Sequence, residues 1–571
     1  MSINKKDVIR LLEKIALYME LKGENPFKIS AYRKAAQSLE RDDRSLSEIK
    51  DFTELPGIGK GTATVITEFI DKQHSETLQL LEDSIPKGLI PLLTLPGLGG
   101  KKLSKLYQEL EIIDEASLRA ACEQGKVQTL KGFGKKTEEK ILESLDNIGK
   151  RPSRLAFPIA LSVKERVENY LDTIKEINRY SIAGSIRRYR EDVKDLDFII
   201  ATNSPHQVKE KLLAYDDLEE IVAAGDTKIS IIASGQYPIN VDFRLVTEEE
   251  FITTLHHFTG SKDHNVLMRQ LAKSQGKKIS EYGVEDLETG EIATFQSEKD
   301  FFASFGLPFI PPEVREGKEE LDLKAEELDL ISEKDILGDL HMHTTWSDGG
   351  QSVEEMVQYA RKKGYEYIAI TDHSKFLRVA NGLTEDRWYK QKAEIERVQE
   401  KFDDIHILTG IEMDILPNGS LDFPDNVLQE IDFVIASIHS SFNQDSKTIQ
   451  KRLETALKNP HVDMIAHPTG RLLGRREGYQ IDVEWLIDKA KETNTILELN
   501  ANPNRLDLSA KWVELAQEQG VSIAINTDAH SYSMLEHMKY GCGTARRGKI
   551  RKETVVNSWT KDSLVSFLKK K

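Results

Sequence analysis

Short apolar segments recur through the last third of the chain, and this pattern constrains the fold more than any other feature. Each segment has the length and the β-branched content of a buried strand, and helical stretches such as 352–364 and 483–493 separate them. Because strands joined by helical crossovers pair in parallel, the pattern predicts a barrel of parallel strands. The segments are YIAIT (367–371), IHILTG (405–410), FVIAS (433–437), VDMIA (462–466), TILEL (495–499) and VSIAI (521–525).

Residues that commonly bind metals follow most of these segments. The carboxyl ends of parallel barrel strands converge on one mouth, so side chains from distant sequence positions would meet there. Imidazoles and carboxylates without thiolates suit manganese, zinc or iron in a hydrolytic site, for which a phosphate ester is the natural target. The predicted ligands are His341, His343, Asp348, His373, Glu412, His439, His467, Asp528 and His530.

Other residues in the same region have more than one interpretation. A lone histidine is more often an ordinary core or surface residue than a ligand, and we interpret His406, His461 and His537 in that way. Arg471 and Arg475 follow His467 closely in the sequence, so they either capture the phosphate of a substrate or are solvated surface residues.

A separate group of carboxylates lies in the middle of the chain. Asp195 and Asp197 bracket one leucine at the start of an apolar strand, so the period of two places both carboxylates on the same face. The alternating segment 239–245 presents Asp242 in the same way. Three carboxylates on adjacent strands can hold two magnesium ions, as nucleotidyl transfer requires. The alternative is that Asp195 and Asp197 form an ordinary polar strand end.

A Gly-Ser turn precedes these carboxylates at Gly184 and Ser185, and Arg187 and Arg188 follow it. A glycine lets the backbone approach a phosphate closely, and arginines can clamp a phosphate through paired hydrogen bonds. Together with the aspartates, the turn predicts a nucleotide triphosphate site. Arg187 is equally well interpreted as an exposed arginine.

Three related turns occur in the helical first 150 residues, at 55–60, 95–100 and 130–135. Each has a GxG core followed by an amphipathic segment, which indicates a repeated helix-turn-helix unit. Backbone N–H groups at such turns can bind phosphate oxygens without reading bases, although a turn that serves only packing has the same pattern. The glycines predicted to contact DNA are Gly57, Gly59, Gly97 and Gly99.

These motifs resemble the family X DNA polymerases, of which polymerase beta is the best-known member, through nearly all of residues 1–315. The segment HFTGS at 257–261 looks like the YFTGS turn with which that family contacts the sugar. The resemblance implies metal binding by Asp195, Asp197 and Asp242, nucleotide binding by Gly184, Ser185, Arg188, His257, Phe258, Gly260 and Asn265, and DNA binding by Lys28, Tyr32, Arg244 and Arg269.

Two positions depart from the family pattern. His257 stands where the family has tyrosine, which puts its stacking and sugar-discriminating role in doubt. Val65 stands at the position of the lysine that forms a Schiff base during sugar-phosphate removal. Valine cannot form an imine, so we do not expect the usual lyase activity.

The last part of the chain resembles the polymerase-and-histidinol-phosphatase (PHP) family across 336–571. The resemblance is carried by HMHTTWSDG, TDHS, GIEMD, SIHSSF, AHPTGR and TDAH, which include the nine residues predicted above as ligands. It implies a distorted seven-stranded (β/α) barrel that binds three metal ions through those residues. Since all nine positions carry competent ligands, an active site is favoured over a vestigial one.

The segment between these regions is acidic. From Glu313 to Asp335 it carries ten acidic and four basic residues, which predicts a solvated connector. We therefore expect a multidomain chain of α and α/β type. The expected parts are a helical domain at 1–80, helix-hairpin-helix fingers at 81–150, a nucleotidyltransferase palm at 151–246, a thumb at 247–314, an acidic linker at 315–335 and the PHP domain at 336–571.

The composition limits the remaining possibilities. The net charge of −16 is unusual for a nucleic-acid binder. Whether the chain can bind DNA therefore depends on how its charges are distributed rather than on their sum. Two distant cysteines exclude a disulfide framework, and no apolar run is long enough to span a bilayer. We expect a cytoplasmic monomer.

The predicted function is gap filling on gapped or nicked DNA with deoxynucleoside triphosphates, as in base excision repair. The PHP site would act as a 3′–5′ exonuclease or 3′-phosphatase that uses manganese or zinc, and incision at abasic sites is a further possibility. Two alternatives remain open. One is a DNA end-binding scaffold with inactive sites, and the other is a small-molecule PHP phosphatase fused to a DNA-binding module.

Overall fold

The computed structural model describes residues 5–569, except 43–45, 47–48, 94, 96–97 and 148–153. The chain divides into two compact units, one of residues 1–151 with 378–381 and the other of residues 152–377 with 382–571. Among the described residues, no helix is both long and apolar enough to cross a membrane.

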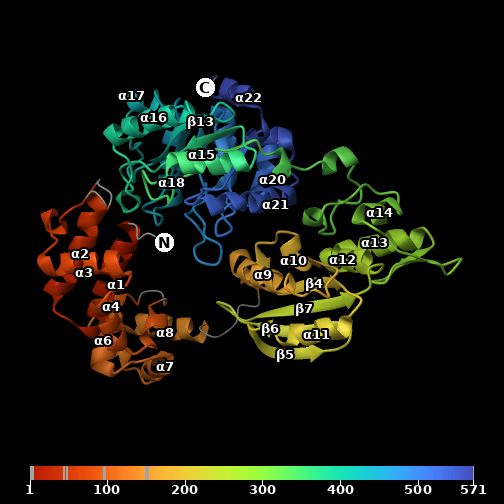
Figure 1. Ribbon diagram of the computed structural model, residues 1–571, viewed down its shortest axis with the longest axis horizontal. Coiled ribbons are helices and arrows are strands. Elements are labelled where there is room, and N and C mark those ends of the chain that lie inside the picture. Colours follow the sequence, from red (N-terminus) through yellow and green to blue (C-terminus); the bar gives the residue numbers. More distant parts are fainter. Residues whose placement is uncertain are drawn as a thin grey trace. The chain divides into compact units, whose positions relative to one another are not determined.

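The described part of the N-terminal region consists of helices (red to orange in Figure 1). The first helix packs against α2, α4 and α6, and its buried face includes Leu12 and Ile15. Val65 is buried in α3 as part of this core. The helices are α1 (Lys5–Lys22), α2 (Pro26–Arg41), α3 (Lys60–Lys72), α4 (Glu76–Asp83), α5 (Leu89–Leu92), α6 (Gly100–Leu110), α7 (Glu115–Glu123) and α8 (Lys135–Asn147).

The second unit begins with a five-stranded sheet in the order β2-β4-β7-β6-β5 (Figure 1). Strands β4 and β7 are parallel neighbours, and the other pairs are antiparallel. The strands are β2 (Arg179–Ile182), β4 (Asp195–Ala201), β5 (Leu218–Ala224), β6 (Lys228–Ala233) and β7 (Ile239–Val246), and a small pair is formed by β1 (Leu155–Ala156) and β3 (Asp192–Val193). The helices are α9 (Phe157–Leu171), α10 (Gly184–Arg187) and α11 (Pro205–Leu213).

A smaller subdomain follows, built around buried aromatic side chains that include Phe301 and Phe302. Its turn at Gly260 is followed by a helix that Ser261 caps, because the Ser261 hydroxyl accepts a hydrogen bond from the main-chain nitrogen of His264. The elements are α12 (Phe251–Thr259), α13 (Lys262–Ser274), β8 (Lys277–Ile279), β9 (Val284–Asp286), β10 (Ile292–Ala293) and α14 (Glu298–Ala303).

The last part of the chain forms the predicted barrel. Seven parallel strands follow one another in chain order, and a parallel bridge between Met342 and Ala529 joins the first strand region to the last. The strands are β11 (Gly338–Asp339), β12 (Tyr367–Ile370), β13 (His406–Asp414), β14 (Phe433–Ser437), β15 (Met464–Ile465), β16 (Ile496–Asn500) and β17 (Ile523–Asn526). The helices are α15 (Val353–Lys362), α16 (Glu385–Gln399), α17 (Asp425–Leu428), α18 (Ser446–Lys458), α19 (Val483–Thr493), α20 (Ala510–Gln519), α21 (Met538–Arg547) and α22 (Lys561–Leu568).

The six apolar segments all contain barrel strands, as predicted. The remaining strand, β11, consists of a glycine and an aspartate, so no apolar run predicted it. Strand β13 continues past Gly410 to Asp414, because residues 410–414 pair with β14. Glu412 therefore lies within a strand rather than after one.

The prediction of a solvated connector at 313–335 is wrong for part of the segment, although residues 324–327 are exposed. Leu328, Leu330 and Ile331 are buried, and so are the acidic residues Glu313 and Glu320. Glu313 pairs with an arginine of α21, and Glu320 lies 2.9 Å from a buried histidine of α13. An acidic composition predicts solvation only where the acids have no buried partners, and Glu313 and Glu320 have them.

Candidate active sites

The three predicted aspartates lie together on the five-stranded sheet. In β4, Asp195 and Asp197 are partly exposed while Leu196 between them is fully buried. In the parallel register, Asp197 is paired with Asp242 of β7. Burial, with repulsion from Asp195 and Asp242, raises the pKa of Asp197 to about 7. A divalent cation would relieve that repulsion, so the donor set fits hard cations bound by oxygen ligands.

Gly184 brings the predicted phosphate-binding turn against these aspartates. It has a φ of +69°, and the preceding residue, Ala183, donates a main-chain hydrogen bond to the carbonyl of Asp197 at 2.7 Å. A Cβ atom at Gly184 would lie 2.9 Å from Oδ2 of Asp197. Ser185 follows in α10. Both the backbone conformation and the close approach therefore require glycine here.

We predict that Gly184→Ala lowers kcat/KM for gap filling by about 10–100-fold, because the strained backbone and the displaced Asp197 together cost about 1–3 kcal/mol. Steady-state extension of gapped DNA measures the effect. The matched control is Gly276→Ala, since Gly276 has a φ of +71° but no atom within 4 Å of a built Cβ. Equal losses in the two variants would show that backbone strain alone, rather than displacement of Asp197, causes the effect.

The two arginines of the turn have different surroundings. Arg188 is mostly buried; its Nη1 donates to the carbonyl of Thr259 at 2.6 Å, and its Nε donates to Glu316 at 3.1 Å. Arg187 instead pairs with both carboxylate oxygens of Glu298, at 3.2 and 2.7 Å. The interpretation of Arg187 as an exposed arginine is therefore wrong, because Glu298 of α14 pairs with its guanidinium and the side chain is only 19% exposed. Its interpretation as a phosphate ligand stays a prediction.

The turn between α12 and α13 collects the remaining predicted nucleotide contacts. The carbonyl of His257 accepts a hydrogen bond from Nδ2 of Asn265 at 2.7 Å. The guanidinium of Arg244, on β7, lies 4.3 Å from the ring centre of Phe258. A Cβ at Gly260 would meet Asn265 Oδ1 at 3.1 Å, so the turn is tightly packed. Arg269 is exposed one turn after Asn265 on α13.

The remaining predicted DNA contacts lie on the N-terminal helices and on the turns before them. On α2, Lys28 is exposed and Tyr32 is half-buried. At Gly59 and Gly99, which directly precede α3 and α6, a built Cβ meets no atom within 4 Å. The main chain at these positions is thus open to a phosphate. Gly57 has a φ of +89°, and Gly97 lies outside the described residues.

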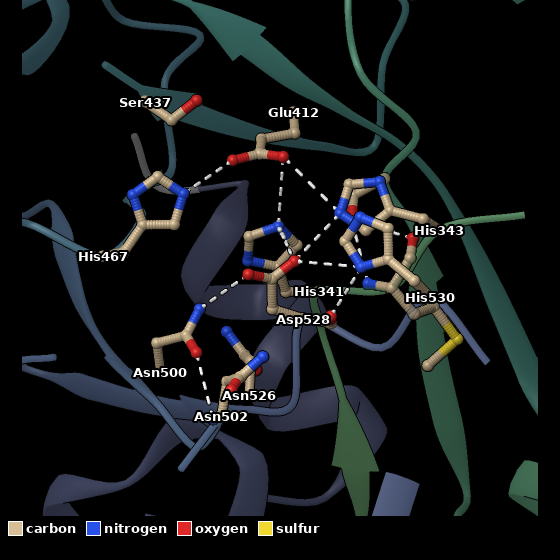
Figure 2. A network of polar contacts seen from close by, with 12 residues as sticks. His341, His343, Glu412, Ser437, His467, Asn500, Asn502, Asn526, Asp528 and His530 are labelled. Atoms are coloured by element: carbon tan, nitrogen blue, oxygen red, sulfur yellow. Dashed lines mark hydrogen bonds and ion pairs between the residues drawn. The ribbon is translucent and has the colours of Figure 1, made fainter. Parts of the chain in front are cut away.

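The nine predicted barrel ligands converge on one site, with Glu412 at its centre. Figure 2 shows His341, His343 and His467 turned toward the Glu412 carboxylate. The carboxylate oxygens lie 2.8–3.5 Å from nitrogens of His341, His343, His373, His439 and His467. Asp528 Oδ1 lies 3.2 Å from Nε2 of His343, and Asp348 Oδ1 lies 3.2 Å from Nε2 of His530.

Ligand atoms in this site form three groups that could each hold a metal ion. The groups are His343, Asp348, His373 and His530; His341, His343 and Asp528; and His373, Glu412 and His439. Two ligands, His467 and Asp528, have φ values of +30° and +52°. Non-glycine residues with such values are strained, and strain of this kind concentrates at functional sites.

The buried nitrogens and oxygens of the site test whether metal ions fit it. Nε2 of His341, both ring nitrogens of His343 and Oε2 of Glu412 are buried without a hydrogen-bond partner among the described residues. Unpaired buried polar atoms are costly unless something binds them. Burial, together with the neighbouring His530 and His373, lowers the pKa of His343 to about 3, which keeps it neutral, as a ligand must be. The residues therefore fit metal ions.

Sequence reasoning missed the residues that orient these ligands. Glu498 is fully buried on β16, and its carboxylate lies 2.7 Å from Nδ1 of His341 and accepts the main-chain N–H of His467. Asp414 lies 3.3 Å from Nδ1 of His439. An acidic residue inside the apolar run TILEL was the signal, because a buried carboxylate needs a specific partner.

We predict that Glu498→Gln lowers the affinity of the barrel site for Mn²⁺ by about 10–100-fold, because a carboxylate behind a ligating histidine fixes its ring and increases its basicity. Metal content after equilibrium dialysis measures the effect. Glu518→Gln is the matched control, since Glu518 is exposed on α20. Metal content equal to that of the unchanged protein would contradict the assignment.

Arg471 and Arg475 have different surroundings, and only Arg475 matches the interpretation as a solvated surface residue. Arg471 pairs with both carboxylate oxygens of Glu191, at 3.0 and 2.8 Å, and Arg475 is exposed. Arg505 of the same region contacts a predicted ligand, because its Nε lies 3.6 Å from Oδ2 of Asp528.

Comparison with known proteins agrees with this architecture. Family models match a helix-hairpin-helix domain at residues 3–75, a SAM-like helix-hairpin-helix tandem at 89–147, a DNA polymerase beta thumb at 254–316 and a PHP domain at 339–502. Over 568 residues, covering 100% of both chains, the protein is 58% identical to the DNA polymerase/3′-5′ exonuclease PolX of Bacillus subtilis (strain 168).

Probable phosphatases are also similar to part of the chain. One from Thermoanaerobacter sp. (strain X514) is 31% identical over 234 residues, which cover 38% of this chain and 89% of the phosphatase. Another, from Caldicellulosiruptor saccharolyticus, is 32% identical over 199 residues, which cover 33% and 78%.

Proposed function

The chain belongs to the family of the bacterial DNA polymerase/3′-5′ exonuclease PolX, and from this premise we propose that it fills short gaps in DNA during base excision repair. The parallel pairing of β4 with β7, which sets Asp197 beside Asp242, is the observation that supports the polymerase site. Deoxynucleoside triphosphates and gapped or nicked DNA are the substrates.

In this proposal, Asp195, Asp197 and Asp242 hold Mg²⁺. Bound magnesium would lower the pKa of the primer hydroxyl and stabilise the leaving pyrophosphate. The main chain at Gly184, the hydroxyl of Ser185 and the guanidinium of Arg188 bind the triphosphate. The turn from His257 to Asn265 receives the sugar and the base, and Arg244 and Arg269 contact DNA.

Helix-hairpin-helix turns bind the DNA backbone on either side of the gap. Gly57, Gly59, Gly97 and Gly99 would offer main-chain N–H groups to phosphates, and Lys28 and Tyr32 would contact the 5′ side of the gap. Such contacts need few cations, which reconciles DNA binding with a net charge of −16. Val65 lies in the core of α3 and cannot form an imine, so the usual lyase reaction is not part of the proposal.

The barrel site is the 3′–5′ exonuclease. We propose that it also removes 3′-phosphates and incises abasic sites, and that its nine ligands hold three Mn²⁺ or Zn²⁺ ions. Bound ions would supply a hydroxide near neutral pH and stabilise the departing oxygen. Glu498 and Asp414 hold the rings of His341 and His439 in their ligating orientations.

A gapped duplex with a labelled primer tests both parts of the proposal. In Mg²⁺ with all four deoxynucleoside triphosphates, we expect the primer to extend to the end of the gap. In Mn²⁺ without nucleotides, we expect it to shorten from the 3′ end. A primer that shortens but never extends would contradict the polymerase function and would support a PHP phosphoesterase joined to a DNA-binding module.

A further inference from the structure

The segment that follows the triphosphate-binding turn is held by a side chain of the barrel domain. Arg547, the last residue of α21, donates from Nη1 to the main-chain oxygen of Arg188 at 3.1 Å. The same nitrogen donates to Oε1 of Glu316 at 2.6 Å, and that oxygen accepts Nε of Arg188 at 3.1 Å. Arg547 therefore supports Arg188 twice, at its main chain and through the Glu316 carboxylate.

Neighbouring residues of this segment are held by the barrel as well. Arg471 forms its paired contact with Glu191, as described above. Gly543 of α21 packs so closely on Tyr189 that a Cβ at Gly543 would lie 2.2 Å from Cε1 of the tyrosine ring. Contacts from the barrel at Arg188, Tyr189 and Glu191 thus fix the path of the chain directly after the turn.

Burial and charge stabilise the Arg188–Glu316–Arg547 cluster. The side chains of Arg188, Glu316 and Arg547 are 11%, 17% and 19% exposed. Burial alone would raise the pKa of Glu316, but Arg188 and Arg547 hold it below its usual range, so the carboxylate is ionised at neutral pH. Hydrogen bonds between charged groups are the strong ones, and partial burial shields them from solvent.

We propose that Arg547 and Glu316 are positioning residues for nucleotide incorporation. They hold the Arg188 guanidinium in the orientation that binds the triphosphate, so the barrel domain completes the nucleotide site of the polymerase. The described hydrogen bonds of Arg188 use Nε and Nη1, and in this proposal Nη2 binds a phosphate oxygen. This inference rests on the proposed role of Arg188 in triphosphate binding.

Steady-state gap filling by the full-length protein tests the inference with Arg547→Ala. We expect the KM for the deoxynucleoside triphosphate to rise about tenfold, the factor that corresponds to about 1.4 kcal/mol of binding free energy, with kcat changed by less than about twofold. Arg547→Lys should recover part of the loss, because an ammonium can reach Glu316 but lacks the planar fork of arginine. Arg551→Ala is the matched control, since Arg551 is exposed in the same domain.

Two further measurements separate positioning from general destabilisation. Arg547→Ala should leave the 3′–5′ exonuclease rate on single-stranded DNA unchanged, because none of its described contacts reaches the barrel ligands. The double variant Arg188→Ala/Arg547→Ala should have the same KM as Arg188→Ala alone, because Arg547 acts through Arg188.

The outcomes distinguish failure of the inference from failure of the underlying function. If Arg188→Ala does not raise the KM for the nucleotide, the proposed role of Arg188 is wrong. If Arg188→Ala raises it but Arg547→Ala does not, or if the two effects multiply in the double variant, the positioning role is wrong. A loss of exonuclease activity in Arg547→Ala that matches its loss of polymerase activity would likewise overturn it.

Discussion

Replacing Asp195 and Asp197 together with alanine should lower the rate of gap filling by about 10³-fold or more, because bound metal ions supply several kcal/mol of transition-state stabilisation. The two side chains share one face of β4 beside Asp242, so their removal leaves one carboxylate, too few to hold two cations. The exonuclease rate should not change, since its ligands come from the barrel. Single-turnover extension of a gapped primer measures the loss.

The matched control for this variant is Asp216→Ala/Asp226→Ala, which removes two exposed aspartates from the same domain. It should extend the primer at the normal rate. Normal extension by the Asp195/Asp197 variant with unchanged DNA binding would contradict the polymerase site.

The second large effect is expected from Glu412→Gln, which should reduce 3′–5′ exonuclease activity by about 10³-fold or more through loss of metal binding. Both carboxylate oxygens of Glu412 face histidine nitrogens. The glutamine amide has only one oxygen, which is neutral, and its nitrogen is a donor that cannot bind a metal ion. Gap filling should continue at the normal rate. Release of the labelled 3′ nucleotide measures the effect.

Glu366→Gln is a suitable control for this variant, because Glu366 is exposed just before β12. Its exonuclease activity should equal that of the unchanged protein. An active Glu412→Gln protein would exclude Glu412 as a metal ligand and would require the nuclease to lie elsewhere in the chain.

The sequence predicted those features that depend on periodicity and on chain order. Alternation alone places Asp195 and Asp197 on one face, and the structure has Leu196 fully buried between them. His341 and Asp528 are 187 positions apart in the sequence, but the parallel strands bring Nε2 of His341 to 3.6 Å from Oδ1 of Asp528. In each case the residue type and its place relative to a strand were sufficient.

Features that depend on a partner from elsewhere in the chain were not predictable. The sequence did not predict that Arg187 is partly buried, because its partner Glu298 lies far away in the sequence, on α14. Glu313 and Glu320 looked solvated because their partners, Arg546 and His264, are distant in sequence. Periodicity records which face a residue occupies, but a buried ion pair is defined only when two elements pack together.

Orienting residues were missed for a related reason. Glu498 stands within a strand that is buried throughout, and the sequence does not say which histidine it supports. Its contact with Nδ1 of His341 depends on closure of the barrel, which brings the Glu498 side chain from β16 to the residue that follows Leu340 after β11. A buried carboxylate in an apolar run is therefore a useful signal, although its partner must be read from the structure.

Anomalous X-ray diffraction from crystals soaked in Mn²⁺ is the most direct test of two separate metal-dependent sites in one chain. We expect manganese peaks between Asp195, Asp197 and Asp242, and a second group of peaks around Glu412 and its histidines. Peaks at only one of these places, or aspartate side chains that diverge when the ion is supplied, would contradict the assignment.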